Sequence, residues 1–128
     1  MTTLLIVDDN PDMRRLVRNI AAAQGDEVFE CEDGDEVLNA FHRYHPDWVV
    51  MDVEMKRMDG LRATEQLVSE HPEVKVIIMT KHNDPETRLA AFEAGAWAFC
   101  GKDDLLSLRA LLLGQNRLPK SIAAPNER

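Results

Sequence analysis

Carboxylate, hydroxyl and amine side chains stand directly after short apolar runs in this chain of 128 residues. Each run is too short for a helix and too continuously apolar for a half-exposed strand, so we interpret it as an inner strand covered on both faces. Open parallel sheets bind ligands at the carboxyl ends of their strands, so side chains just beyond the runs are predicted to meet at one edge. They are Asp8 and Asp9 after residues 4–7, Asp52 after 48–51, Thr80 after 74–79, and Lys102 after 97–100 and a glycine.

Converging acids create a charge problem that a metal ion would solve. Two carboxylates ~4 Å apart repel one another by about 4 kcal/mol at an effective dielectric constant near 20. Mg²⁺, or Mn²⁺ in its place, prefers oxygen ligands, and Asp8, Asp9 and Asp52 would supply two or three of them. Lys102 adds a compact positive charge and Thr80 a hydroxyl donor. These groups suit transfer of a phosphoryl group onto Asp52, whose oxygen would attack in line.

Five apolar segments alternate with five segments of helical periodicity. This alternation predicts an α/β domain with helices on both faces of a five-stranded parallel sheet. The second strand, residues 27–31, carries Glu27 and Glu30 among apolar residues, which suits an edge position. The domain is expected to span residues 1–114. Residues 115–128 contain prolines and few apolar residues, so a flexible tail or the start of a linker is predicted there.

Cap residues predict where several helices begin and end. Asn10-Pro11 and Asp84-Pro85 each place a cap before a proline at the first helical position. The apolar faces of the helices that follow them are predicted to include Leu16 and Leu89, respectively. The last helix is predicted over roughly residues 103–114, with leucines as its apolar face.

Composition restricts the classes of function. The net charge of −8 disfavours direct binding to nucleic acid. Apolar runs are far shorter than a bilayer span and no signal-peptide pattern opens the chain, so a cytoplasmic protein without membrane contact is expected. The two cysteines, Cys31 and Cys100, have no metal-ligand spacing and are predicted to be buried thiols. The histidines are interpreted as scattered surface residues: His42, His45, His71 and His82.

Taken together and in this order, the residues after the strands resemble the receiver domain of two-component response regulators. The resemblance covers about residues 4–113 and includes the turn Met55, Met58, Asp59 and Gly60 after Asp52. It implies a flavodoxin-like (βα)5 doubly wound fold with strand order 2-1-3-4-5.

The resemblance also implies a role for each residue of the site. Asp52 would be the phosphoacceptor, taking a phosphoryl group from phosphohistidine on a sensor histidine kinase or a histidine phosphotransfer protein. Asp9, Asp52 and the backbone carbonyl of Glu54 would ligate Mg²⁺, with Asp8 acting directly or through water. Lys102 would pair with the phosphoryl oxygens.

A conformational switch is implied as well. Thr80 would swing toward the phosphoryl group, and Phe99 would follow it inward and alter the surface of the fourth helix, fifth strand and fifth helix. Phosphorylation adds nearly two negative charges at Asp52, enough to bias such an element. The changed surface would act on a downstream effector domain or protein, and homodimerisation around Phe99 is a further possibility.

Some positions depart from the family pattern. Lys56 stands where proline is frequent, and Asp103 follows Lys102 where proline is usual, so no cis peptide is expected there. Lys81 replaces a residue that is usually small; it could crowd the incoming group or give it a second cation. Glu54 and His82 would flank the path of an attacking water and tune the lifetime of the phosphoryl group.

Two other functions stay open. A receiver-like scaffold that binds partners without being phosphorylated would keep the fold, and Lys81 is the feature that favours it. A phosphatase of the haloacid dehalogenase type also uses an aspartyl nucleophile, but that family wants a second Asp where this chain has Glu54, and a cap domain for which the chain lacks room. The expectation is therefore a signalling phosphoacceptor that at most catalyses its own phosphorylation and dephosphorylation.

Overall fold

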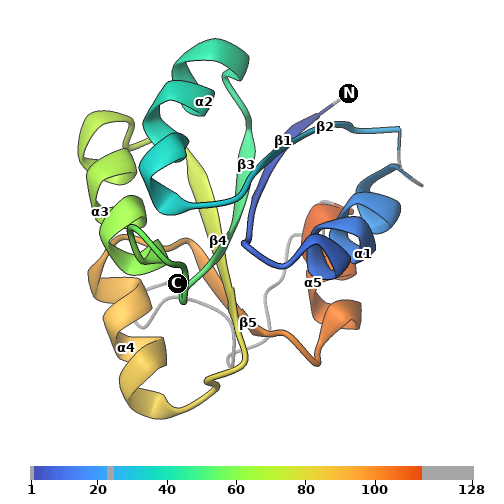
Figure 1. Ribbon diagram of the computed structural model, residues 1–128. Coiled ribbons are helices and arrows are strands. Elements are labelled where there is room, and N and C mark those ends of the chain that lie inside the picture. Colours follow the sequence, from blue (N-terminus) through green and yellow to red (C-terminus); the bar gives the residue numbers. More distant parts are fainter. Residues whose placement is uncertain (1, 23–24, 114–128) are drawn as a thin grey trace.

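The computed structural model describes residues 2–22 and 25–113. The tail predicted for residues 115–128 lies outside this part. Five parallel strands form one sheet in the order β2-β1-β3-β4-β5 (Figure 1). Both the α/β architecture and the implied strand order are confirmed, with β2 at an edge. The strands are β1 (Thr3–Val7), β2 (Glu27–Cys31), β3 (Trp48–Asp52), β4 (Lys75–Thr80) and β5 (Ala98–Gly101).

Helices cover both faces of the sheet. Helices α1 and α5 lie on one face, whereas α2, α3 and α4 lie on the other (Figure 1). A short 3-10 turn, η1, precedes α2 and has no counterpart in the sequence prediction. The elements are α1 (Pro11–Ala22), η1 (Gly34–Glu36), α2 (Val37–Tyr44), α3 (Gly60–Glu70), α4 (Pro85–Glu93) and α5 (Leu105–Leu112).

The strands divide their side chains between two apolar cores. Successive residues of a strand point to opposite faces. Thus Ile77 of β4 packs in the core under α1 and α5, and its neighbour Ile78 packs in the core under α2, α3 and α4. All of β1 after Thr3 is buried in this way. The sheet is therefore covered on both sides. At the carboxyl ends of its strands, the apolar side chains of the core are followed by polar ones.

Side-chain caps begin four of the helices. The Asn10 carboxamide oxygen accepts the N–H of Asp12 at 2.9 Å, and Asp84 accepts the N–H of Thr87 at 2.7 Å. Asp59 caps α3 in the same way. The last helix begins at Leu105, later than predicted, because Asp104 accepts the N–H of Ser107 at 3.2 Å and fixes the start. Short polar side chains thus set these boundaries.

Two leucines predicted on buried helix faces are exposed. Leu16 is 47 % and Leu89 is 53 % exposed. Successive helical residues are about 100° apart around the axis. In α1 the buried residues are Val17 and Ala21, and in α4 the buried residue is Ala91, so the two leucines fall outside the contact with the sheet.

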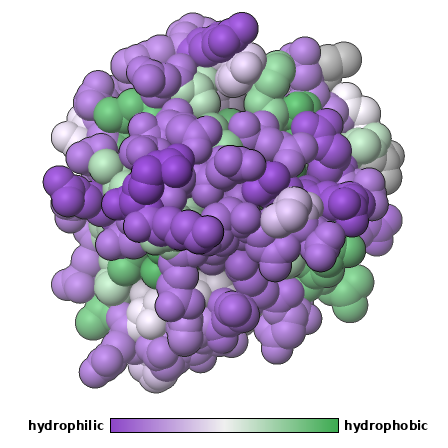
Figure 2. All heavy atoms as spheres, in the orientation of Figure 1, coloured by the Kyte–Doolittle hydropathy of each residue, from purple (hydrophilic) through white to green (hydrophobic). Residues whose placement is uncertain are grey.

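The face of the molecule in Figure 2 is mainly hydrophilic, with small separate hydrophobic patches.

No helix within residues 2–22 and 25–113 has both the length and the apolar character needed to cross a lipid bilayer.

Candidate functional site

The carboxylates of Asp8, Asp9 and Asp52 lie together at the carboxyl edge of the sheet. Strands β1 and β3 are neighbours, with Val7 paired to Met51, so the acids that follow come side by side. One carboxylate oxygen of each acid lies within 4.8 Å of the other two. Asp8 and Asp52 are only 4 % and 5 % exposed, whereas Asp9 is exposed. The structure therefore brings together the three acids singled out from the sequence.

Lys102 reaches this cluster from the end of β5. Its Nζ lies 2.9 Å from Oδ2 of Asp8 and 3.3 Å from Oδ1 of Asp52. The backbone N–H of Lys102 donates to the carbonyl oxygen of Thr80 at 2.9 Å. This bond holds the backbone of Lys102 against the end of β4. No cis peptide bond occurs in the described residues, so the Lys102–Asp103 bond is trans, as the missing proline predicts.

The charges in the cluster are unequal, with three carboxylates facing one ammonium. Burial, together with the negative charge of Asp8, raises the pKa of Asp52 to about 6 even though Lys102 opposes the change. Burial works to lower the pKa of Lys102, but the hydrogen bond to Asp8 and the charge of Asp52 outweigh it, and the net pKa is raised. Lys102 therefore remains an ammonium at neutral pH, and negative charge is left uncompensated.

The start of α1 holds Asp8 in place. The N–H of Asn10 donates to Oδ1 of Asp8 at 2.9 Å, while Nη1 of Arg14 donates to its backbone carbonyl at 2.7 Å. Both oxygens of the Asp8 carboxylate thus have donors, one from Asn10 and one from Lys102. Such fixed partners keep the carboxylate in one orientation.

A pocket of about 500 Å³ opens above the acids. Asp52 contributes to its wall, so the otherwise buried carboxylate faces this space. Two exposed residues that the sequence singled out, Glu54 and Lys81, also line it. The lining residues are Asp9, Asn10, Met13, Asp52, Glu54, Lys81 and Lys102.

Glu54, which lines this pocket, contacts His82. Nε2 of His82 lies 2.6 Å from Oε1 of Glu54, a short hydrogen bond between the β3–α3 and β4–α4 loops. Thr80 lies behind them: it is 1 % exposed, does not line the pocket, and its Oγ1 accepts the N–H of His82 at 3.1 Å. The hydroxyl predicted to act as a donor is therefore close to the site but set back from the open space.

Phe99 is a core residue in this structure. It is 1 % exposed and pairs with Ile78 in the β4–β5 ladder, in the core under α2, α3 and α4. Thr80 lies two residues after Ile78 on β4. Phe99 and Thr80 therefore belong to neighbouring, hydrogen-bonded strands. The aromatic ring lies inward.

Asp33, a buried acid that shapes the site, was not predicted from the sequence. It is 2 % exposed, and its carboxylate accepts the backbone N–H groups of Arg57 and Met58 at 2.9 and 2.8 Å. Burial would raise the pKa of Asp33, but these hydrogen bonds outweigh it and hold the pKa below its usual range. Asp33 thus anchors the loop that leads from Asp52 to α3. Asp33 also caps η1 by accepting the N–H of Asp35 at 3.4 Å, but its two shorter hydrogen bonds join a distant turn that no local pattern reveals.

Gly60 is required by close packing against Asp52. A Cβ at this position would collide with the backbone carbonyl oxygen of Asp52, and Gly60 itself donates its N–H to the carbonyl of Val53 at 2.8 Å. The start of α3 therefore lies directly against the end of β3. This contact fixes the backbone that carries Asp52.

The donor set of this site fits a hard divalent cation. Three carboxylates within 4.8 Å and an uncompensated negative charge are the ligands and the electrostatics that Mg²⁺ requires. No thiol competes nearby as a soft ligand, since Cys31 and Cys100 are buried and burial raises the pKa of each to about 12. The residues present therefore fit the magnesium site expected from the sequence.

Comparisons with known proteins agree with this geometry. The family model of the response regulator receiver domain matches residues 4–112. Over 96 residues the chain is 36 % identical to the regulatory protein AtoC of Escherichia coli, covering 75 % of this chain and 21 % of AtoC. Over 125 residues it is 32 % identical to the uncharacterized transcriptional regulatory protein YhcZ of Bacillus subtilis, covering 93 % of this chain and 58 % of YhcZ.

A solved structure has the same fold. The two-component response regulator of the LuxR family from Aurantimonas sp. SI85-9A1 superposes with a TM-score of 0.80 and 27 % sequence identity, covering 98 % of this chain and 91 % of that one. The chain spans about a fifth of AtoC and just over half of YhcZ. Given the family match, the strand order and the acids at the sheet edge, the chain belongs to the response regulator receiver domains of two-component signalling.

Proposed function

We propose that Asp52 is the phosphoacceptor of this receiver domain. The observation that carries the proposal is the position of its carboxylate, buried on the core side, open to the pocket, and 3.3 Å from Nζ of Lys102. An oxygen of Asp52 forms a bond to phosphorus while the bond between phosphorus and the donor's imidazole nitrogen breaks. The imidazole leaves with that electron pair. The donor is a sensor histidine kinase or a histidine phosphotransfer protein.

Mg²⁺ would be held by Asp9 and Asp52, with Asp8 directly or through water and the backbone carbonyl of Glu54. When bound, it supplies positive charge for the carboxylates and for the phosphoryl oxygens. Lys102 keeps a positive charge beside the attacking oxygen, because its pKa is raised. Asp52 attacks as the ionised carboxylate, and a pKa of about 6 leaves it mainly ionised at neutral pH.

Phosphorylation changes the surface through Thr80 and Phe99. A phosphoryl group brings nearly two negative charges and strong acceptor oxygens to Asp52. The Thr80 hydroxyl lies set back behind the pocket, so it moves toward those oxygens, and Phe99 rearranges with it across the β4–β5 pair. The output is read on α4, β5 and α5 by an effector domain or a separate protein, or by a second copy of the domain.

A receiver-like scaffold is the second candidate function. The observation that favours it is Lys81, whose exposed cationic side chain lines the pocket. A lysine there could pair with the acids and occupy the space that an incoming phosphoryl group would need. The position of Asp52 argues against the scaffold function. Its carboxylate contacts Lys102, and Asp52 lines the open pocket, where a phosphoryl donor could reach it.

Intact mass spectrometry separates these functions. The chain is incubated with a small phosphoryl donor, such as acetyl phosphate, with and without Mg²⁺. The proposal predicts one phosphoryl adduct on the wild type in the presence of Mg²⁺, little with EDTA, and none on Asp52→Asn. A wild type that stays unmodified, while remaining folded by circular dichroism, would favour the scaffold.

A further inference from the structure

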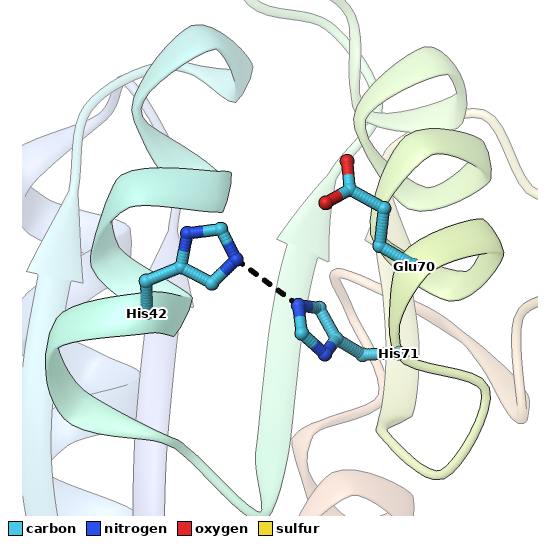
Figure 3. A group of neighbouring side chains, drawn as sticks. All are labelled: His42, Glu70 and His71. Carbon is cyan, nitrogen blue, oxygen red and sulfur yellow. Dashed lines mark hydrogen bonds between the residues drawn. The ribbon is translucent and has the colours of Figure 1, made fainter.

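Two histidines that the sequence analysis treated as scattered surface residues meet in the structure. His42 belongs to α2, and His71 caps the end of α3. Their Nε2 atoms face one another at 3.2 Å, and the Glu70 side chain lies beside them (Figure 3). Helices of a parallel α/β sheet run opposite to the strands, so the end of α3 lies at the amino edge of the sheet. This cluster is therefore at the opposite end of the domain from Asp52.

The spacing of the three side chains matches a metal site. A Zn²⁺ ion binds imidazole nitrogen at ~2.0–2.1 Å, so two such ligands in tetrahedral geometry are about 3.3 Å apart. The His42 and His71 nitrogens are separated by 3.2 Å. A carboxylate oxygen of Glu70 completes a set of three atoms that all lie within 4.8 Å of one another. Two imidazoles and one carboxylate leave a fourth position for water.

The surroundings of His71 orient its ring for this purpose. The ring lies against the buried Phe41, with centroids 4.1 Å apart and planes inclined by 32°. On its far side, Nδ1 lies 3.8 Å from Oε1 of Glu73. A carboxylate that accepts a hydrogen bond from the second nitrogen of a histidine holds the proton there and leaves the other nitrogen free to bind a metal. At 3.8 Å Glu73 does not make this bond in the structure, but its exposed side chain lies close enough to form it when an ion binds. In His71 that other nitrogen is the one that faces His42.

The exposure of the cluster allows an ion to enter. His42 and Glu70 are exposed, and His71 is half-buried. Among the described residues the other candidate metal group, Asp8, Asp9 and Asp52, offers only carboxylate oxygen, and the two cysteines are buried as thiols. A borderline-soft ion should therefore prefer the group that contains two imidazoles.

We propose that His42, His71 and Glu70 form a binding site for Zn²⁺ that bridges α2 and α3. The ion replaces the direct contact between the two imidazoles, and Glu73 serves as a positioning residue for His71. Binding ties together two helices that otherwise meet through apolar packing, so it stabilises this face of the domain. The site is separate from the acidic pocket, since none of its residues lines that pocket.

Calorimetric titration of the full chain with Zn²⁺, in buffer containing excess Mg²⁺, tests the proposal. One ion per chain is expected, and His42→Asn or His71→Asn should weaken binding by about tenfold or more, with Glu73→Gln weakening it less. His45→Asn and His82→Asn are matched controls that should bind Zn²⁺ as the wild type does. If binding is lost only in Asp52→Asn, the ion occupies the acidic pocket and the proposal is wrong.

A second measurement needs no variant and so does not depend on how the variants fold. In the NMR spectrum of the wild type, added Zn²⁺ should shift or broaden the ring C–H signals of His42 and His71 together, and leave those of His82, which contacts Glu54 at the other edge of the sheet, unchanged. Ring signals of His42 and His71 that stay unchanged at saturating Zn²⁺ would contradict the site.

Discussion

Nζ of Lys102 lies 3.3 Å from Oδ1 of Asp52, although β4 separates the strands that carry them. The contact joins the ends of β3 and β5 in a cluster where acids outnumber bases. It offsets only part of the negative charge, and the pKa of Asp52 is raised to about 6. The site is therefore arranged to accept positive charge, and the excess of negative charge should lower the stability of the folded domain when no cation is bound.

Replacing Asp52 by Asn should stabilise the domain when no divalent cation is present. The folded state binds the Asp52 proton more tightly than the unfolded state, because the pKa rises from 3.8 to about 6 on folding. The stabilisation that Asp52 gains from its proton is therefore complete below the unfolded pKa of 3.8, and it is lost as the pH rises through the folded pKa of about 6. Above pH ~6 the Asn variant should thus have the larger free energy of unfolding.

Urea unfolding in EDTA, from pH 4 to 8, gives this comparison. The difference in unfolding free energy between Asp52→Asn and the wild type should grow with pH and then level off above the folded pKa. Addition of Mg²⁺ should stabilise the wild type more than the variant. A wild type that is the more stable protein at pH 8 in EDTA would contradict the charge imbalance.

The hydrogen bond between His82 and Glu54 should lengthen the life of the phosphoryl group. At 2.6 Å it joins the β3–α3 and β4–α4 loops and holds Glu54, which lines the pocket that an attacking water would have to enter. Glu54→Ala and His82→Ala should each speed dephosphorylation several-fold. Because the two groups act as a pair, their effects on the activation free energy of dephosphorylation should not add in the double variant. The double variant should differ from the sum of the single variants by about 0.5–3 kcal/mol. Rates equal to the wild type in both single variants would show that the pair has no such role.

Lys81 should speed phosphorylation by small anionic donors. It is exposed, lines the pocket and adds positive charge there. Lys81→Ala should slow the reaction with acetyl phosphate, and the loss should shrink as salt screens the charge. Lys56→Ala, a matched change in an exposed residue outside the pocket lining, should have little effect. A faster reaction in Lys81→Ala would instead mean that this side chain crowds the donor.

Removing the Asp33 carboxylate should destabilise the whole domain. Asp33→Ala leaves the backbone N–H groups of Arg57 and Met58 without their acceptor, at a cost of about 1–3 kcal/mol in unfolding free energy. The control Asp35→Ala breaks only an exposed ion pair to Arg57 and should cost less than about 1 kcal/mol. Equal losses in the two variants, measured by urea unfolding, would mean that Asp33 is no anchor for the loop.

The sequence predicted the architecture because its signals are local. Apolar runs gave the strands, and caps such as Asp84-Pro85 gave the helix starts. The acids and Lys102 could be placed at one edge because parallel strands put their ends there. The strand order, in contrast, came from the family resemblance, since the runs themselves do not specify which strands pair.

Features that depend on distant packing could not be predicted. The contact between His42 and His71 arises where α2 meets α3, and each histidine alone has the pattern of a surface residue. Asp33 gains its role from a turn more than twenty residues away along the chain. Leu16 and Leu89 fit helical periodicity, but the sheet contacts only part of each helix face. Burial of this kind depends on the angle at which a helix packs.

Mapping the modified residue tests the central claim most directly. The chain is phosphorylated with acetyl phosphate and Mg²⁺, the acyl phosphate is reduced with borohydride, and the peptides are sequenced by mass spectrometry. We predict that the reduced residue is Asp52, with Asp8 and Asp9 unchanged. Modification at Asp8, at Asp9 or at any residue other than Asp52 would contradict the account.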